Sequence, residues 1–195
     1  MSVAYDYGYG PYTVEDLHGL PDAGRSFELV DGWLIELAPS TRHDFLARRL
    51  SRILERAADD ANARVYIQAP MDITTPAGAR KPDVAVIDAA AASSARRLGR
   101  SLYHGADVLL AVEVVSRGSG SEREDRARKV TEYALAGIPH YWIVDFDPEP
   151  RIQVLRVATD QGRYGAPLVF SGDDTVKLED PFPISFSLSD LLDFS

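Results

Sequence analysis

Val-Leu-Leu-Ala-Val-Glu-Val-Val, residues 108–115, contains the longest unbroken apolar run of the chain. This composition predicts a strand that is buried on both faces, as in the centre of an α/β sheet. One acid, Glu113, interrupts the run. A carboxylate at this place costs several kcal/mol if it is buried without a partner. Glu113 must therefore be paired, bind a metal ion or face a cleft.

Helix and strand patterns alternate on either side of this strand. Shorter strands are predicted at about 64–74, 83–87, 140–144, 151–158 and 163–170. Helices are predicted to begin at Thr13 and to span about 42–60, 122–136 and 188–193. Two segments have the composition of loops: 88–104, a mobile loop or a poorly packed helix, and 116–121, a Gly/Ser loop. The pattern predicts an α/β fold with a central mixed β-sheet.

The two ends of the chain add further elements. Asp31-Gly32 joins two strand-like segments, 27–30 and 33–37, and this dipeptide is typical of a two-residue β-hairpin turn. The strands predicted after residue 150 form a C-terminal β extension. Residues 1–12 carry four tyrosines among glycines and are predicted to be a flexible N-terminal arm. We expect residues 13–195 to form a single domain.

Composition excludes several classes of function. The chain has 195 residues, of which 45% are hydrophobic and 26% charged, so it is expected to fold into a globular core. It has no cysteine, which excludes thiolate catalysis and cysteine-bound metals. Its net charge of −9 argues against a protein that coats nucleic acid. No apolar run reaches the roughly 20 residues of a membrane span, and the N-terminus does not resemble a signal peptide. A cytoplasmic protein without membrane contact is expected.

A second acid precedes another apolar strand. Asp83 comes directly before Val84-Ala85-Val86-Ile87. Two strand carboxylates that converge in space would suit Mg²⁺ or Mn²⁺, which prefer oxygen ligands. The alternative is that Asp83 and Glu113 each cap or edge a strand without any chemical role.

The helix predicted for 122–136 brings a third charged group. Asp125, Lys129 and Tyr133 are spaced i, i+4, i+8 and therefore share one helix face. If the helix packs on the sheet, Lys129 reaches the two acids. Only three of the 21 basic residues are lysines, which either marks positions that need a compact ammonium or reflects chance. A solvated helix face with i, i+4 ion pairs is the alternative.

These residues together resemble the Uma family of restriction endonucleases, within the PD-(D/E)XK nuclease superfamily. The resemblance extends from about Tyr12 to Leu192. It rests on short motifs in a fixed order: FELVDG at 27–32, His43 after Pro39-Ser40-Thr41, KPD at 81–83, VEVVS at 112–116, Asp125-Arg126 to Lys129 and Tyr133, and GIPHYWIVD at 137–145. The resemblance implies a restriction-endonuclease-like core, with the sheet flanked by helices.

The resemblance also implies an activity, namely hydrolysis of DNA phosphodiester bonds by a metal-dependent endonuclease. Asp83, Glu113 and the Val114 carbonyl would hold Mg²⁺ or Mn²⁺, and Glu28 would contribute from the hairpin. The ion would activate a water molecule and bind the phosphate. Lys129 would orient or deprotonate that water, or balance the charge of the transition state.

One position departs from the wider superfamily. The residue two after Glu113, normally lysine, is Val115 here. In the Uma-like pattern the lysine lies on the following helix, where Lys129 matches it. Lys81, directly before Pro82-Asp83, is a second candidate for the ammonium.

Three further residues are expected to support this site. His43 lies on the apolar stripe of its helix, and a core histidine bonded to a backbone carbonyl is the main expectation, with a direct role as the alternative. Tyr133 is expected to pack below Lys129 or to contact phosphate. Asp125 shares the helix face of Lys129 and is a candidate for the same supporting role.

Two other functions stay open at this point. The first is a catalytically weak or inactive nuclease-fold module that binds nucleic acid or a protein partner. The second is a metal-dependent hydrolase of another phosphate ester, or else the chain is an unrelated structural protein. For a nuclease, a homodimer is expected because one active site cuts one strand. The aromatic arm and Trp142 are the surfaces predicted to support it.

Overall fold

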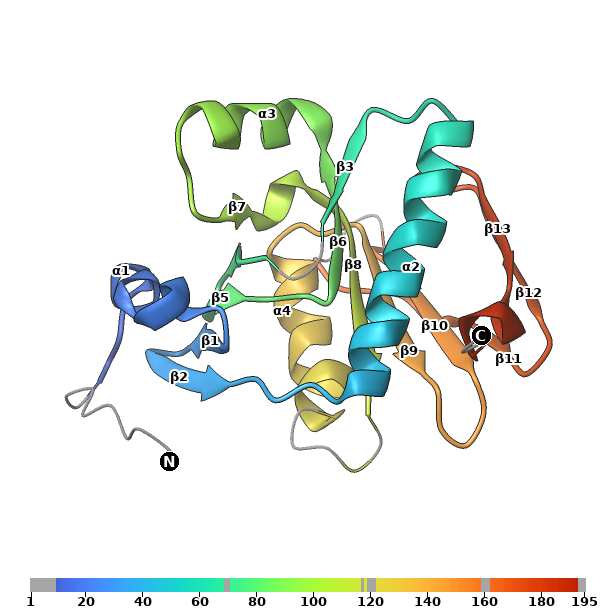
Figure 1. The fold of residues 1–195 in the computed structure, drawn as a ribbon, viewed down its shortest axis with the longest axis horizontal. Helices are drawn as coiled ribbons and strands as arrows, with labels where there is room; N and C mark the ends of the chain where they lie inside the picture. The colour runs from blue at the N-terminus through green and yellow to red at the C-terminus, as the bar shows by residue number, and fades with distance from the viewer. Residues whose placement is uncertain (1–9, 69–70, 117, 119–121, 159–161, 193–195) are drawn as a thin grey trace.

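A computed structural model describes residues 10–68, 71–116, 118, 122–158 and 162–192, and every structural statement below refers to these residues. The described residues form a large six-stranded sheet, a smaller five-stranded sheet and a two-stranded sheet, with helices packed on the first two (Figure 1). Tyr5, Tyr7 and Tyr9 of the predicted arm lie outside the described residues, as does most of the predicted Gly/Ser loop. Tyr12 lies inside them, and its backbone N–H donates to the Gly32 carbonyl at 2.8 Å.

The large sheet has six strands in the order β11-β10-β9-β8-β6-β3. Their bounds are β3 (Val65–Gln68), β6 (Val84–Asp88), β8 (Val108–Val115), β9 (His140–Asp145), β10 (Arg151–Arg156) and β11 (Leu168–Ser171). β8 and β9 are parallel, and the other neighbouring strands are antiparallel. The apolar strand 108–115 is therefore central in a mixed sheet, which confirms the predicted fold class.

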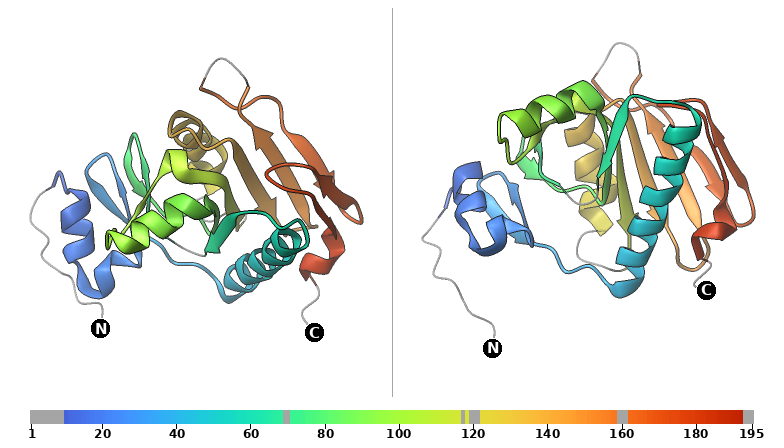
Figure 2. Two further views of the ribbon diagram at one scale, coloured as in Figure 1. Left: turned by 90° about the horizontal axis from the view of Figure 1, so that it is seen from above. Right: turned by 45° about the horizontal axis from the view of Figure 1, so that its top comes forward.

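Each face of this sheet is covered. On one face lie α2 (Thr41–Asp60), the strand pair β12 (Thr175–Leu178) and β13 (Ile184–Ser187), and the 3₁₀ helix η4 (Leu188–Leu192). On the other lie α3 (Ala89–Arg97) and a helix that begins with a π-helical turn, η3 (Glu124–Arg128), and continues as α4 (Lys129–Leu135). Figure 2 shows α2 and the β12–β13 pair side by side.

The alternation of side chains along β8 assigns its residues to the two faces. Leu110, Val112 and Val114 pack in the core beneath α2. Ala111 and Val115 pack in the core beneath α3 and α4. Because successive side chains of a strand point to opposite faces, Glu113 lies on the α4 side with Ala111 and Val115.

The smaller sheet carries the N-terminal hairpin. Its order is β2-β1-β5-β4-β7, with β1 (Phe27–Val30), β2 (Trp33–Glu36), β4 (Ile73–Thr75), β5 (Gly78–Arg80) and β7 (Tyr103–His104). Three short helices flank it: α1 (Val14–Gly19), η1 (Pro21–Gly24) and η2 (Gly105–Asp107). Asp31 and Gly32 have φ angles of 50° and 78°, as the two-residue turn requires. The predicted hairpin is thus confirmed.

Two predicted strands differ from the structure, and the segment 88–104, predicted as a mobile loop or a poorly packed helix, is helical in part. The single strand predicted for 64–74 is wrong, because β3 and β4 belong to different sheets and only β3 pairs with β6. The strand predicted for 163–170 begins only at Leu168, as β11. The segment 88–104 contains a helix, α3, whose Ala92 and Ala95 are buried. The strands β12 and β13 and the π-helical turn were not predicted.

Trp142 does not offer a surface for a second subunit. Its side chain is fully buried in β9, in the core shared with α2 and η4. The prediction that this residue supports a dimer is therefore wrong. The periodicity of a parallel central strand gives no indication of exposure, since both of its faces are covered.

None of the described helices combines the length and the apolar character needed to cross a membrane.

Candidate active site

Glu113 is the centre of a buried polar cluster between the large sheet and α4. Its side chain is 3% exposed. Its Oε1 accepts hydrogen bonds from the Lys129 ammonium at 2.9 Å and from the Tyr133 hydroxyl at 2.6 Å. The acid in the apolar strand is therefore paired, and both donors come from the helix face predicted to reach it.

Lys129 lies among three carboxylates. Its Nζ is 2.9 Å from Glu113 Oε1, 3.2 Å from Glu28 Oε1 and 3.0 Å from Asp125 Oδ1. Asp125 Oδ1 is buried and forms this ion pair, but it has no hydrogen-bond partner among the described residues. Burial disfavours the ammonium, but the charges of Glu113 and Glu28 outweigh it and raise the pKa of Lys129 well above its ordinary value. Lys129 is thus a cation at neutral pH.

The pKa of Glu113 is raised as well, but for this acid the main cause is burial. Burial raises the pKa of Glu113 well above its ordinary value, and the negative charges of Asp83, Asp125 and Glu28 add to the increase against the effect of Lys129. The pKa of Asp125 is raised for the same reasons, burial first. The cluster holds more negative charge than one ammonium neutralises.

Asp83 lies at the start of β6, beside the end of β8. Its Oδ2 accepts a hydrogen bond from the Val114 backbone N–H at 2.7 Å and lies 3.0 Å from His43 Nε2. Because β6 pairs with β8 and Val114 directly follows Glu113, the two predicted metal-binding acids lie at neighbouring positions of the sheet. The Val114 carbonyl was predicted to bind the metal ion. The contact that the structure describes between Val114 and Asp83 is made by the Val114 N–H.

His43 has a carboxylate partner rather than the backbone carbonyl that was expected. It lies in the first turn of α2, where the Ser40 side chain caps the helix, and this turn is adjacent to the start of β6. Burial lowers the pKa of His43, but the hydrogen bond and charge of Asp83 outweigh this effect, and the net shift is upward. His43 therefore helps to orient Asp83.

Glu28 enters the cluster from the hairpin strand β1. Burial raises its pKa, but the charges of Lys129 and Arg80 outweigh burial and lower it overall. Its Oε1 accepts from the Lys81 backbone N–H at 2.8 Å, and its Oε2 accepts from Arg80 Nη1 at 3.0 Å. These bonds tie Glu28 to β5 and the residue after it, and its ion pair with Lys129 links the hairpin to α4.

Arg80 is a residue that the sequence analysis did not single out. It is 1% exposed and binds Glu132 through Nε at 2.7 Å and Nη2 at 2.8 Å. With its bonds to Glu28 and to Glu124, the guanidinium joins β1, β5, η3 and α4. Its position directly before Lys81-Pro82-Asp83 was the only signal in the sequence.

Lys81 lies apart from Asp83 and Glu113. Its Nζ binds Asp72 Oδ1 at 2.6 Å, and Asp72 Oδ2 lies 3.0 Å from His18 Nε2. The Ser101 hydroxyl in turn lies 2.9 Å from His18 Nδ1. Among the described residues, the Lys81 ammonium thus pairs with Asp72, while the Lys81 backbone N–H donates to Glu28.

The donor set matches the way proteins hold magnesium. Among the residues that the structure describes, no three or more Asp, Glu or His side chains are arranged to enclose a metal ion. The hydrogen bonds described for Asp83 and Glu113 use one oxygen of each acid, Asp83 Oδ2 and Glu113 Oε1. Mg²⁺ is usually bound by one or two carboxylates, with waters and substrate phosphates completing its shell. Asp83 and Glu113 fit that requirement.

The fold and the site together define an α/β protein whose central strand carries a buried acid paired with an ammonium from the following helix. The fold is similar to that of a crystal structure from Anabaena variabilis ATCC 29413, described as "a putative nuclease belonging to DUF820". That likeness has a TM-score of 0.70 at 17% sequence identity and covers 93% of this chain and 97% of the other.

The chain belongs to the Uma2 family. The family model, described as "Putative restriction endonuclease", matches residues 14–191. The resemblance inferred from the motifs is therefore confirmed. A search of curated proteins found no match.

Proposed function

We propose that this protein is an endonuclease that uses Mg²⁺ or Mn²⁺ to hydrolyse phosphodiester bonds in DNA. Membership of the Uma2 family supports nuclease function. The observation that carries the proposal is the Glu113–Lys129 pair. A carboxylate on the central strand and an ammonium 2.9 Å away, both almost fully buried, lie next to Asp83.

Asp83 and Glu113 would hold the ion through their other oxygens, Asp83 Oδ1 and Glu113 Oε2. A bound divalent cation supplies Lewis-acid activation of water and neutralises charge on the phosphate. His43 and the Val114 N–H keep the other oxygen of Asp83 fixed. Tyr133 and Lys129 do the same for Glu113. Each acid is thus positioned through one oxygen and offers the other.

Lys129 acts as a cation rather than as a base in this proposal. Its raised pKa keeps the proton on Nζ at neutral pH. The ammonium can therefore stabilise negative charge that develops on the phosphoryl oxygens. Glu28 and Asp125 hold Nζ in place, and Arg80 holds Glu28. We include homodimerisation in the proposal because cutting both strands of a duplex is simplest with two such sites.

One observation favours a second candidate function, an inactive nuclease-fold module that binds nucleic acid or a protein partner. Val115 occupies the position where the wider superfamily has lysine, and Lys129 is held by three carboxylates. In an inactive module this ion-pair network would serve only to join the two sheets.

Plasmid cleavage separates the two candidates. Wild-type protein with Mg²⁺ or Mn²⁺ is expected to nick or linearise supercoiled plasmid, and chelation by EDTA to abolish the reaction. Glu113→Gln and Asp83→Asn are expected to lower the rate by several orders of magnitude, since each removes a ligand charge. Glu15→Gln, at an exposed site of α1, is the matched control and should cleave like wild type. Equal rates for Glu113→Gln and wild type would contradict the proposal.

A further inference from the structure

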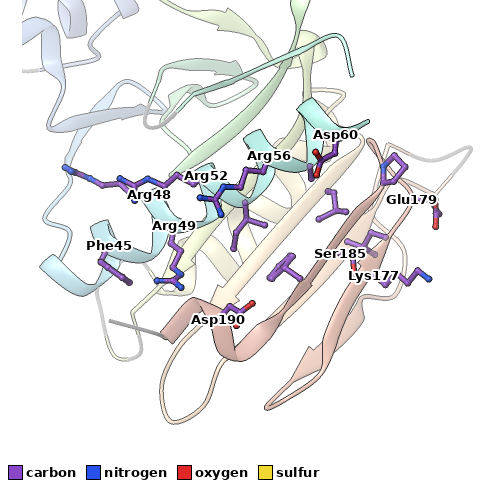
Figure 3. Close-up of a pocket in the computed structure, with 16 residues that line it drawn as sticks. Phe45, Arg48, Arg49, Arg52, Arg56, Asp60, Lys177, Glu179, Ser185 and Asp190 are labelled. Atoms are coloured by element: carbon purple, nitrogen blue, oxygen red, sulfur yellow. The ribbon is translucent and has the colours of Figure 1, made fainter. Parts of the chain in front are cut away.

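A groove runs along α2 on the face of the large sheet that α2 shares with β12 and β13. It has a volume of about 920 Å³. Its basic lining residues are Arg48, Arg49, Arg52, Arg56 and Lys177. Figure 3 shows the four arginines along α2, with Lys177 on the strand pair across the groove.

The charge of this groove is opposite to that of the whole chain. Five basic and three acidic residues line it, the acids being Asp60, Glu179 and Asp190. The whole chain has 21 basic and 30 acidic residues. Asp60 and Glu179 lie at the end of the groove that is farther from Arg48 and Arg49, and Asp190 lies nearer to Arg49 (Figure 3).

The arginines are not explained by the packing of α2. Arg48, Arg52 and Arg56 are exposed, and the structure gives them no ion pair among the described residues. They are spaced i, i+4, i+8, and like charges at this spacing destabilise a helix. Three exposed guanidinium groups in one row, with no ion pair among the described residues, form a surface suited to an anionic ligand.

The row begins near the candidate active site. His43, in the first turn of the same helix, lies 3.0 Å from Asp83. At 1.5 Å per residue, Arg48 to Arg56 extend about 8 to 20 Å along the axis from His43. Glu113 itself lies on the opposite face of the sheet, beneath α4, so the contact between His43 and Asp83 is what links α2 to the candidate site.

The groove lacks the features that bind single strands. Single-strand binders stack bases on exposed aromatic rings. Phe186 is only 8% exposed, and the Arg49 guanidinium lies over the ring of Phe45, 5.9 Å from its centre. The lining instead presents guanidinium groups, which bind phosphate oxygens in pairs of hydrogen bonds.

We propose that Arg48, Arg52 and Arg56, together with Lys177, bind the sugar–phosphate backbone of duplex DNA. The choice of ligand rests on the nuclease function proposed above. Contacts to phosphates carry no base information, so this surface binds duplexes of any sequence. It gives an acidic protein one local surface for a polyanion.

Fluorescence anisotropy with a labelled duplex in EDTA tests this surface, because no cleavage is expected without metal. The test variant is the triple substitution Arg48→Gln, Arg52→Gln and Arg56→Gln. The control carries the same charge change at exposed arginines elsewhere: Arg25→Gln, Arg97→Gln and Arg163→Gln. Circular dichroism verifies that both variants are folded.

The test variant is expected to bind at least 10-fold more weakly at 0.1 M salt. The plot of log K against log[salt] is expected to lose about 2 to 3 units of slope, since each phosphate contact contributes about 0.9. The control is expected to stay within two-fold of wild type, and two unrelated duplexes should bind equally.

Three outcomes would overturn the inference: unchanged affinity and slope in the test variant, no duplex binding by wild type, or preferential binding of single-stranded DNA or RNA through the same arginines. Plasmid cleavage with Mn²⁺ distinguishes the two proposals. Cleavage by wild type with unchanged binding by the test variant would contradict only the arginine surface. Arginine-dependent binding without cleavage would contradict only the nuclease proposal.

Discussion

The ammonium of Lys129 neutralises only part of the charge that surrounds it. Glu28, Glu113 and Asp125 all lie within 3.2 Å of its Nζ, and Asp83 adds a fourth negative charge. In a buried site an excess carboxylate destabilises the fold unless a cation compensates it. A divalent ion beside Asp83 and Glu113 would provide that compensation, so the electrostatics and the proposed chemistry agree.

Replacing Lys129 by methionine tests its role as a cation. The substitution keeps a long side chain but removes the charge, and we expect the cleavage rate to fall about 10²–10³-fold, the usual effect of losing one group that stabilises transition-state charge. Removing one partner of a buried ion pair also costs about 3–5 kcal/mol of stability. Rates are therefore measured well below the melting temperature found by circular dichroism.

The Lys129→Arg variant separates charge from geometry. It keeps the cation but cannot place it as an ammonium does, so partial recovery of the rate over Lys129→Met is expected. Cleavage by Lys129→Met within three-fold of the wild-type rate would show that the ammonium has no role in the chemistry.

The pKa of His43 reports its contact with Asp83. In wild type the pKa is raised above its ordinary value. This contact therefore stabilises the folded state fully below about pH 6.5, and the contribution is lost as the pH rises through the folded-state pKa. In Asp83→Asn, burial remains while the main opposing charge is removed, so the pKa of His43 is expected to fall.

NMR titration of the His43 ring measures this difference directly. Asp44→Asn is a useful control because Asp44 is exposed and 3.7 Å from His43 Nδ1, so a smaller change is expected. The same pKa in wild type and Asp83→Asn would mean that the two side chains do not interact in solution.

The β8 strand and α4 together position the acids and the ammonium. The apolar run 108–115 predicts a central strand because both of its faces must be covered, and the structure agrees. The spacing of Lys129 and Tyr133 correctly placed both side chains on one helix face toward Glu113. These parts of the site could be predicted because each of them depends on the pattern within a single element: the apolar run of β8, or the residue spacing along α4.

Other elements carried too little pattern to be predicted. β12 and β13 have four residues each, and their alternation of exposed and buried positions is short. The stretch 64–74 is strand-like at both ends, but Pro70 interrupts it and the two ends join different sheets. Proline has no backbone donor for a central strand, so this residue was an overlooked signal.

Close packing of η2 against α4 depends on Gly105. A Cβ at this position would lie 2.6 Å from the Ala136 Cβ, 2.8 Å from the Thr74 carbonyl oxygen and 2.9 Å from the Ala136 carbonyl oxygen. Two of these atoms belong to the backbone and cannot turn away. Gly105→Ala is therefore expected to lower the free energy of unfolding by about 1–3 kcal/mol, measured by urea denaturation.

Gly19→Ala is the matched control for this substitution. A Cβ at Gly19, the last residue of α1, would have no heavy atom within 4 Å. A change within about 0.5 kcal/mol is expected there, as for most surface positions. Equal stability of Gly105→Ala and wild type would contradict the described packing of η2 on α4.

The molecule as a whole joins its two sheets through ion pairs at the candidate site. Arg80 and Glu28 connect the small sheet to α4, and Arg128 pairs with Asp31 in the hairpin turn. Contacts of this kind come from three or four separate elements, so no spacing in the sequence indicates them. This explains why Arg80 was not predicted although Asp83, Glu113 and Lys129 were.

The distribution of charge also belongs to the whole molecule. The net charge of −9 argues against a protein that coats nucleic acid with its whole surface. The arginine row on α2 shows that one local surface is nevertheless basic. The row is visible in the sequence only as four arginines of a helix. Its position beside β12 and β13 and near Asp83 requires the folded chain.

Anomalous diffraction from a crystal grown with Mn²⁺ tests the central claim most directly. We expect one peak that lies between the side chains of Asp83 and Glu113, with carboxylate oxygens at about the 2.0–2.1 Å seen for such sites with Mg²⁺. The peak should disappear in Glu113→Gln crystals grown in the same way. No peak at these two carboxylates under saturating Mn²⁺ would contradict the claim that they form a metal-dependent catalytic centre.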